Sequence, residues 1–470
     1  MVFPIVGGNQ SSGDIITNSL RFDGSSSYLY HTHQSGNKDT FTFSSWIKFG
    51  DLDNDTSADV LFSVTNTGYV IIRFEDKQLD YLDYDGSDVG TVSTNRLFRD
   101  VSAWYHIVVA IDMTQSTDSN RVKLYVNGSQ ESSFATATYQ PQNQDTVVNT
   151  AAEHRIGRES GNYFSGYMAD VNFIDGTAYA ASDFGETNDN GVWIPKKPAV
   201  TYGTNGYRLE FKQTGTSANA SGIGADTSGQ GNHHSVSGLA ATDITTDTPQ
   251  NNFCTLNPLA DANLAGATFS EGNCKVDVGK SGVESGVIST FLLSSGKWYW
   301  ESKMIDRQTT NTFMVGVVAS QVTGTGTIAN YTDNKFYYAN NGDIHDTDAS
   351  GDNGTDYGDS YDEGDIVGVA LDLDNNKIYF SKNGTFQASG DPANNSNGHS
   401  ITAPASTNLG GYIAGFGGFQ TYSHVIEINF GNAPYAISSG NSDANGYGNF
   451  EYSVPSGFFA CCTKNLVEYG

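Results

Sequence analysis

The sequence predicts an all-β protein built as two antiparallel β-sandwich domains in tandem, and three observations support this prediction. Segments rich in aromatic and β-branched residues recur along the chain, each short and bounded by Gly, Asn, Asp or Ser. Aromatic residues make up 12 % of the chain, charged residues only 16 %, and glycines number 53, a balance typical of short strands joined by tight turns. At 470 residues the chain is too long for one ordinary core.

The clearest local pattern is a β-hairpin over residues 364–384, GDIVGVALDLDNNKIYFSKNG. Apolar residues alternate along its two strands, so one face is predicted to be buried. That face carries Val367, Val369, Leu371, Leu373, Ile378 and Phe380. An Asp-Asn-Asn turn at 374–376 reverses the chain. A weaker copy, WYHIVVAID followed by VKLYVNG, begins at Trp104 and indicates that one architectural unit is used twice.

Read in order, the chain divides into four parts. Residues 1–15, an apolar patch followed by a Gly/Ser stretch, are expected to be an N-terminal docking arm, with a frayed terminus as the alternative. Residues 16–195 read as the first sandwich. Residues 196–250 are rich in Gly, Ser, Thr and Asn and read as a connector with one strand, GYRLEF. Residues 251–470 read as the second sandwich.

The chain is strongly acidic, with 52 Asp and Glu against 24 Lys and Arg and a formal charge of −28. This charge repels phosphate backbones and anionic membrane surfaces, so no nucleic-acid partner is expected. No segment is long and apolar enough to span a membrane, so no membrane insertion is expected. We also expect no secretion signal at the start of the chain. The four cysteines lack metal-site spacing and are expected to be free and buried.

The first half resembles a known family in the order of its strands. SLRFDGSSSYL, FTFSSWIKF, WYHIVVAID with VKLYVNGSQ, and HRIGRESGNYFSGYMADVNFIDGTA follow one another as in a laminin-G-like or concanavalin A-like lectin/glucanase jelly roll, over about residues 16–195. In the second half GKWYWE, the 364–384 hairpin and INFGN resemble a SPRY (B30.2-like) domain over about residues 251–460. Both resemblances imply antiparallel sandwiches that bind ligands through rim loops.

Because the first resemblance includes glucanases, paired carboxylates in the sequence would indicate hydrolysis. A retaining glycosidase needs an acid and a nucleophile about 5 Å apart. No Glu-x-Asp-x-x-Glu stretch is present, Glu427 stands without such a partner, and Glu301 and Asp306 are mismatched in spacing. No nucleophile elbow occurs, and the histidines share no spacing. The protein is therefore expected not to be an enzyme, with a polysaccharide hydrolase as the weakest alternative.

An acidic segment over residues 343–365 is the candidate metal site. Asp346, Asp348, Ser350 and Asp352 alternate as oxygen donors in the first half of a Ca²⁺ loop, with Gly351 for the sharp turn. Tyr357 stands where the loop would place its closing Glu, so a solvated acidic loop is the alternative. No other cofactor is expected. Asp226, His233 and His234 also suggest a metal, but adjacent His side chains in a strand point to opposite faces.

Aromatic residues around the rim of the second sandwich form the candidate ligand site. They are Tyr331, Tyr337, Tyr338 and Tyr357. Exposed tyrosine rings stack on sugars or on partner side chains. The alternative is that these tyrosines are half-buried strand residues.

Together the two resemblances lead to a functional expectation. A lectin-type jelly roll joined to a SPRY-like domain, without a secretion signal, is similar to structural proteins of marine tailed bacteriophages. It implies a fibre, spike or decoration unit assembled in the host cytoplasm and exposed on the tail or capsid of the virion. Its expected partners are other virion proteins, further copies of itself, with a trimer as the common form among fibres, and a host-surface glycan. A bacterial surface or secreted adhesin is the alternative.

Overall fold

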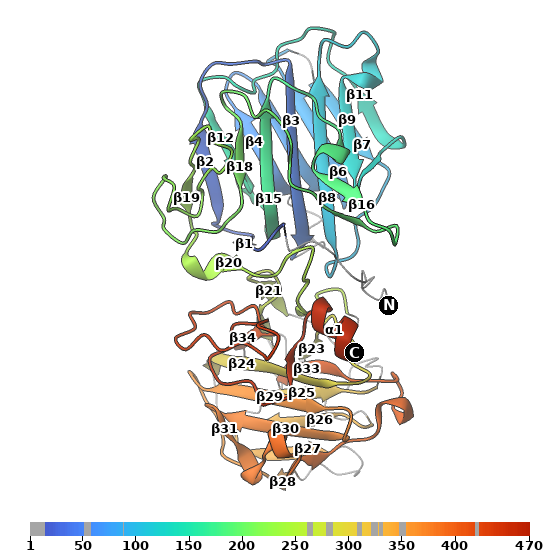
Figure 1. Cartoon of the computed structure of the whole chain (residues 1–470), viewed down its shortest axis with the longest axis vertical. Coiled ribbons are helices and arrows are strands. Elements are labelled where there is room, and N and C mark those ends of the chain that lie inside the picture. The colour runs from blue at the N-terminus through green and yellow to red at the C-terminus, as the bar shows by residue number, and fades with distance from the viewer. Residues whose placement is uncertain are drawn as a thin grey trace. The chain divides into compact units, whose positions relative to one another are not determined.

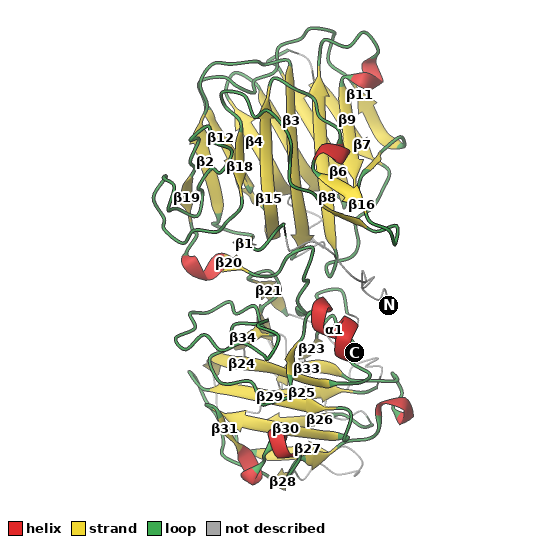
Figure 2. Cartoon of the chain, viewed as in Figure 1, coloured by secondary structure: helices red, strands yellow, loops and turns green. Residues whose placement is uncertain are grey.

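The computed structural model describes residues 15–50, 58–87, 89–260, 267–278, 285–307, 313–320, 328, 332–346, 354–418 and 423–470 (Figure 1). It divides into two compact units, one made of Gly7–Gln250 and the other containing Asn251–Gly470. Strands dominate both units (Figure 2). The predicted all-β fold, two antiparallel β-sandwiches in tandem, is confirmed.

The first unit contains two facing antiparallel sheets, which we call sheets A and B. Sheet A runs, in spatial order, β10 (Ser129–Gln130), β9 (Val122–Val126), β8 (Trp104–Asp112), β3 (Thr40–Phe49), β15 (Ser165–Asp175), β1 (Ser19–Asp23) and β20 (Ile244–Thr245), with β18 (Tyr207–Leu209) also paired to β15. Sheet B runs β11 (Phe134–Thr138), β7 (Val89–Thr94), β6 (Gln78–Tyr84), β5 (Tyr69–Glu75), β4 (Asp59–Thr65), β12 (Glu153–Ile156), β2 (Tyr28–Thr32) and β19 (Ser235–Ser237).

The core of the first sandwich lies between these sheets because alternate residues of each strand point inward. In β3 the inner residues include Phe41, Phe43 and Phe49, and in β8 they include Ile107 and Val109. The predicted hairpin of this half is present, with β8 paired to β9. In the middle of β15 the pairing with β3 shifts between Ala169 and Asn172, which is a β-bulge.

Residues 196–250 do more than connect the two sandwiches. We expected one strand there, but the structure has β18, β19 and β20, and each adds to a sheet of the first sandwich. The sequences of the two further strands, SVS and IT, lack the aromatic and apolar pattern that predicted GYRLEF as a strand. Two small hairpins, β13 (Arg158–Glu159) with β14 (Asn162–Tyr163) and β16 (Gly185–Thr187) with β17 (Trp193–Pro195), complete this unit.

The second unit has two sheets as well, which we call sheets C and D. Sheet C runs β21 (Thr268–Ser270), β22 (Lys275–Val278), β34 (His424–Asn429), β24 (Lys297–Arg307), β29 (Ile366–Asp372), β30 (Lys377–Lys382) and β31 (Thr385–Phe386), with β32 (His399–Ser400) paired to β30 and β35 (Phe459–Ala460) paired to β24. Sheet D runs β23 (Ser285–Ile288), β33 (Ile413–Gly418), β25 (Phe313–Val318), β26 (Lys335–Tyr338), β27 (Asp343–Asp346) and β28 (Thr355–Asp356).

The predicted hairpin of the second unit is β29 with β30, at the centre of sheet C. Val369 pairs with Phe380 and Leu371 with Ile378, and all four side chains lie in the core between sheets C and D. Asn376 has φ +54° in the turn, a conformation that Asn tolerates better than most residues. The alternation of apolar residues and the residues of the turn therefore both predict the hairpin that the structure has.

Helical structure is sparse in the described residues. The short 3₁₀ turns are η1 (Asp118–Asn120), η2 (Ala181–Asp183), η3 (Ala241–Asp243), η5 (Gln387–Ser389), η6 (Pro392–Asn394) and η7 (Pro404–Ser406). The α-helix α1 (Thr463–Tyr469) has seven residues. In the described ranges no helix has the length and apolar character needed to cross a membrane.

Candidate functional site

The structure places two of the candidate tyrosines in the interior. Tyr337 and Tyr338, on β26, are 0 % and 3 % exposed, so the expectation that they offer aromatic surface is wrong. Successive residues of a strand point to opposite faces, and here both faces are covered. Tyr337 packs in the core between sheets C and D, and Tyr338 packs in a second apolar cluster with Met314 and Phe336.

The remaining two candidate tyrosines differ in what can be said of them. Tyr357 is half-buried, and its hydroxyl accepts a hydrogen bond from the Phe380 backbone N–H at 3.2 Å. Burial raises the pKa of Tyr357 to about 12. Its ring contacts those of Tyr337 and His399, so it serves to close the edge of sheet C. Tyr331 lies outside the described residues.

The predicted calcium loop is mostly outside the described residues. Asp346 ends β27, where it pairs with Lys335, whereas Asp348, Ser350 and Asp352 fall in the undescribed range. Among the described residues, no group of three or more His, Cys, Asp or Glu side chains is placed to hold a metal ion. The calcium site stays a prediction, which calorimetry with Ca²⁺ can test.

Glu301, considered as a catalytic acid, is buried beneath the segment that follows β34. Its carboxylate accepts five hydrogen bonds, from the backbone N–H groups of Glu451 and Tyr452, the hydroxyls of Tyr299 and Tyr435 and the amide of Asn429. Burial raises the pKa of Glu301, and these hydrogen bonds partly oppose that rise. A carboxylate held in this way anchors the chain, because no lone pair remains free for a substrate.

Glu427, the other candidate carboxylate, also has a local partner. It lies on β34 with its carboxylate 3.4 Å from the ammonium of Lys275 on the neighbouring strand β22. In the backbone register, Glu301 pairs with Asn429, whereas Glu427 pairs with Lys303. The two carboxylates therefore each engage their own neighbours, and neither has the environment expected of an acid–nucleophile pair.

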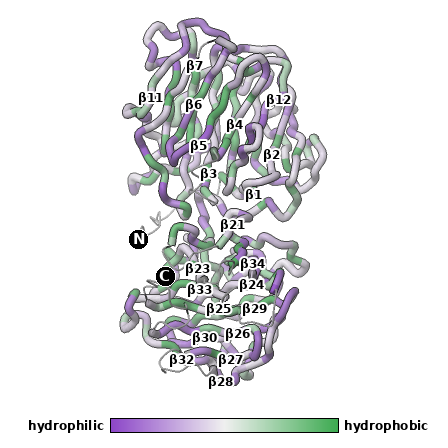
Figure 3. The backbone as a smooth tube through the Cα atoms, turned by 180° about the vertical axis from the view of Figure 1, so that it is seen from behind, coloured by the Kyte–Doolittle hydropathy of each residue, from purple (hydrophilic) through white to green (hydrophobic). Residues whose placement is uncertain are grey.

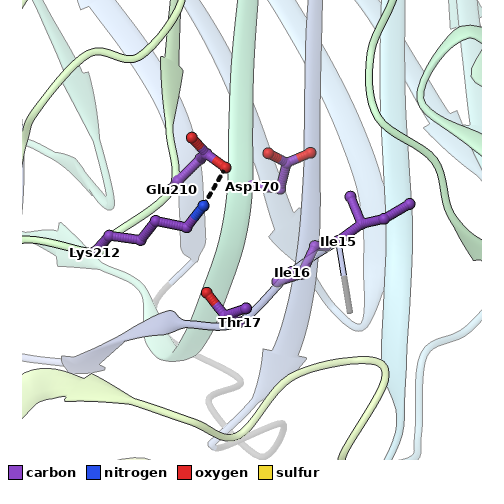
Figure 4. A pocket seen from close by; sticks show the side chains of 6 residues that line it. All are labelled: Ile15, Ile16, Thr17, Asp170, Glu210 and Lys212. Carbon is purple, nitrogen blue, oxygen red and sulfur yellow. Dashed lines mark hydrogen bonds and ion pairs between the residues drawn. The ribbon is translucent and has the colours of Figure 1, made fainter. Parts of the chain in front are cut away.

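A hollow in the first unit is lined by Ile15, Ile16, Thr17, Asp170, Glu210 and Lys212 (Figure 4). Its volume, open mouth included, is about 160 Å³. Its charged groups are already paired, since Asp170 accepts a hydrogen bond from Arg208 at 2.6 Å and Glu210 lies 2.8 Å from Lys212. This hollow is too small for a sugar and its polar groups are already engaged.

The outer face of sheet B offers the better site. In Figure 3, β7, β6, β5, β4, β12 and β2 lie toward the viewer. Alternation along β2 turns Leu29 into the core and leaves Tyr28 and Tyr30 half-buried on the outer face. Tyr30 pairs with Arg155 of β12 on one side and with Ser235 of β19 on the other. At β2 this outer face is therefore accessible, and it carries tyrosine rings.

Two of the rings on this face contact one guanidinium group. Arg158, on β13, lies over the ring of Tyr28 at 4.7 Å and over that of Tyr163, on β14, at 5.2 Å. The Tyr30 ring is 5.6 Å from that of Tyr28. We call these four residues, Tyr28, Tyr30, Arg158 and Tyr163, the Tyr–Arg cluster. Each of the four is half-buried, so part of each side chain remains accessible to a ligand.

Sequence reasoning missed this cluster although it recorded both of its segments. YLYHT shows the alternation of a half-exposed strand, and HRIGRESGNYF shows a tight hairpin. Nothing in the sequence indicates that β2 pairs with β12, more than 100 residues later. The contact between Tyr28 and Arg158 is a product of that pairing.

Directly beneath this face lies a cluster of histidines. His31, His33, His154 and His234 come from β2, the residue after it, β12 and the residue before β19. The rings of His33 and His154 stack at 3.5 Å with an angle of 8° between their planes. The His31 ring is 5.4 Å from that of His234. Sequence reasoning treated these histidines as scattered, because their proximity also depends on strand pairing.

The hydrogen bonds of this histidine cluster indicate which ring nitrogen carries a proton. His33 donates from Nδ1 to the Asn149 side-chain oxygen at 2.9 Å, and His234 donates from Nδ1 to the Asn232 carbonyl at 3.1 Å. The Nε2 atoms of His33 and His234 are buried and have no hydrogen-bond partner in the described part of the chain. Burial lowers the pKa of His154 and of His234 to about 3 and that of His33 well below its usual value.

Comparison with known families assigns both halves. Residues 23–182 match the family model described as the concanavalin A-like lectin/glucanases superfamily, of the laminin G type. Residues 297–396 match the SPRY domain model. The chain therefore joins a domain that matches the concanavalin A-like model to one that matches the SPRY model, as its strand order suggested, and these two domain types suggest a binding function. None of the curated proteins matches the chain significantly.

Solved structures are similar to parts of the chain or to most of it. The SPRY domain of human HERC1 is 15 % identical, with a TM-score of 0.27, over 37 % of this chain and 96 % of that one. The native heptameric SAP-like pentraxin from Limulus polyphemus is 17 % identical, with a TM-score of 0.28, over 36 % and 80 %. Domains LG4-5 of the mouse laminin alpha1 chain are 10 % identical, with a TM-score of 0.29, over 97 % and 91 %.

Proposed function

We propose that this protein is a non-catalytic binding protein that holds a carbohydrate on the open face of sheet B. The observation that carries the proposal is the Tyr–Arg cluster, with rings from Tyr28, Tyr30 and Tyr163 on an accessible sheet face. Tyrosine is suited to sugars because its ring packs on C–H groups while its hydroxyl exchanges hydrogen bonds. The match of residues 23–182 to a lectin-type family supports the same ligand class.

The polar groups around the cluster support binding without cleavage. Glu153, the carboxylate on β12, lies 2.6 Å from Arg155, and a second carboxylate would have to face it across the ligand for hydrolysis. We therefore propose recognition alone, with hydrolysis as the alternative that product analysis would reveal.

A glycan array with the full chain tests this function. Tyr28→Ala combined with Tyr30→Ala should reduce binding about 10- to 100-fold, because each lost stacking contact is worth roughly 0.5–1.5 kcal/mol beyond its buried area. Tyr452→Ala, in the second unit, is the matched control and should bind as the parent does. Unchanged binding by the double variant would remove the site from this face, and chain-shortened products from a bound glycan would establish an enzyme.

For the biological setting, we propose a structural protein of a tailed bacteriophage, exposed on the tail or capsid as a fibre, spike or decoration unit. Two independently folded sandwiches with a binding-type face suit an exposed unit that touches host glycans and neighbouring virion proteins, including further copies of itself. The charge of −28 keeps such a unit apart from nucleic acid. A bacterial adhesin is the alternative, and a gel and reconstruction of purified particles distinguish the two by whether the protein is present at fixed copy number.

A further inference from the structure

Arg158 is held in a fixed orientation by its surroundings. Its guanidinium lies over the neighbouring rings of Tyr28 and Tyr163, and its Nε–H donates to the Ser160 carbonyl at 2.9 Å. Its own carbonyl accepts a hydrogen bond from the Ser63 hydroxyl at 2.6 Å, which fixes the backbone of β13 to β4. A guanidinium oriented in this way loses little entropy when it binds a further group.

Arg158 also differs from most other arginines in lacking an acidic partner. Arginines that pair with carboxylates in the described residues are Arg73, Arg96, Arg121, Arg155, Arg208 and Arg307. In the described part of the chain, the two terminal amino groups of Arg158 have neither a carboxylate nor a hydrogen-bond acceptor. In a chain with 52 acidic residues and 24 basic ones, an unpaired, half-buried and oriented guanidinium needs an explanation.

The geometry of the Arg158 guanidinium indicates which chemical groups it can bind. The terminal amino groups of a guanidinium form two parallel hydrogen bonds, a geometry that matches the oxygens of a carboxylate or a sulfate ester. The rings of Tyr28, Tyr30 and Tyr163 flank the same position and supply surfaces for a sugar ring. We infer that the Tyr–Arg cluster is a subsite for an acidic sugar unit, whose carboxylate or sulfate binds Arg158 while its ring packs on the tyrosines.

This inference rests on the proposed glycan-binding function and narrows it. The overall charge of −28 repels a uniformly charged polyanion, whereas a fixed guanidinium attracts a single oxyanion at contact distance, well inside the Debye length of about 8 Å at physiological salt. Glu153, the nearby carboxylate on β12, is engaged by Arg155. The subsite therefore favours a glycan with an isolated acidic unit among neutral ones.

The experiment compares matched sugars by calorimetry with the full chain. One pair is a short oligosaccharide with a single uronate and the same oligosaccharide after reduction of its carboxyl to an alcohol. The other pair is a monosulfated disaccharide and its desulfated form. The parent should bind the acidic member of at least one pair roughly 10- to 100-fold more tightly, as expected for hydrogen bonds to a charged group. The pair that shows the preference identifies the oxyanion.

Three variants assign the preference to Arg158. Arg158→Gln should abolish the preference for the acidic member, and Arg158→Lys, which keeps the charge without the fork, should retain only part of it. Arg99→Gln is the matched control, because Arg99 is an exposed arginine on the same sandwich and outside the cluster. Thermal unfolding should show that each variant is folded, so that a change in preference reports on the ligand contact.

The outcomes separate this inference from the proposed function. Binding that depends on Tyr28 and Tyr30 but is equal for both members of each pair overturns the acidic subsite and leaves the proposed function standing. A preference that survives in Arg158→Gln also overturns it. Absence of binding to all four sugars, together with a blank glycan array, overturns both.

Discussion

The two outer faces of the first sandwich carry ion pairs of similar length in different surroundings. On sheet A, Lys48 lies 2.9 Å from Asp247, and both side chains are 0 % exposed. On sheet B, Arg155 lies 2.6 Å from Glu153, and these side chains are 28 % and 36 % exposed. The contacts are alike, but only the first has lost its water. The face, and not the distance, decides what each pair contributes to stability.

The difference begins in the strands. Nine of the ten residues of β3 are buried, because apolar and aromatic side chains such as Trp46 also point outward and the segment that includes Trp193 packs over them. In β2 only the second of the five residues, Leu29, is buried. A strand apolar on both sides requires a cover, whereas a strand that alternates can leave one face free for a ligand. Sheet B is therefore where this sandwich can bind.

Asp247→Asn should test the buried pair most severely. The change leaves the Lys48 ammonium buried without its counter-charge, and we expect the first sandwich to lose about 3–5 kcal/mol of its free energy of unfolding. Asp247 also accepts a hydrogen bond from the Trp104 indole at 3.0 Å, which Asn can retain. Urea unfolding followed by tryptophan fluorescence measures the loss. A loss below 1 kcal/mol would contradict the contrast between the two faces.

Acid should act on the histidine cluster under the open face. Burial lowers the pKa of His234 to about 3 and that of His33 well below its usual value, so both take up protons on unfolding at mildly acidic pH. Their contribution to stability is complete above the unfolded pKa of about 6.5 and is lost as the pH falls. Replacing both by Phe removes this loss, so between pH 7 and pH 5 the parent should lose more stability than His33→Phe/His234→Phe, with about 2 kcal/mol of the difference due to His234 alone.

The comparison between parent and variant is needed because other groups titrate in the same range. His31, His154 and His233 act on the two rings electrostatically, and Asp226 acts on His31. Burial raises the pKa of Asp80 to about 6 and of Asp83 to about 7, so these carboxyls oppose the histidines as the pH falls. Urea unfolding at pH 7 and pH 5 measures how much stability the parent and the double variant each lose. His399→Phe, in the second unit, should leave it unchanged, and equal losses in parent and double variant would disprove it.

How far the sequence could lead is clear from two strands. Alternation identified the hairpin of β29 with β30, including which of its residues face the core. Alternation does not show whether another segment covers the outer face of a strand. Tyr337 and Tyr338 were therefore predicted to be accessible, although both are buried. Alternation also says nothing of pairing between distant strands. The Tyr–Arg cluster depends on Arg158 and Tyr28 meeting across such a pairing, and no local pattern encodes that contact.

Arg155→Ala should have the smallest effect of the three changes and completes the contrast. Its ion pair with Glu153 is nearly a third exposed and screened by salt, so its removal should cost no more than about 1 kcal/mol of unfolding free energy. Raising the salt to about 1 M, where the Debye length falls to about 3 Å, should shrink even that difference. The cost of Asp247→Asn should persist at the same salt, since a buried charge is little screened. If salt changes the unfolding free energy of both variants equally, the two ion pairs are equally exposed to solvent. That result would contradict the proposal that the ligand binds on sheet B.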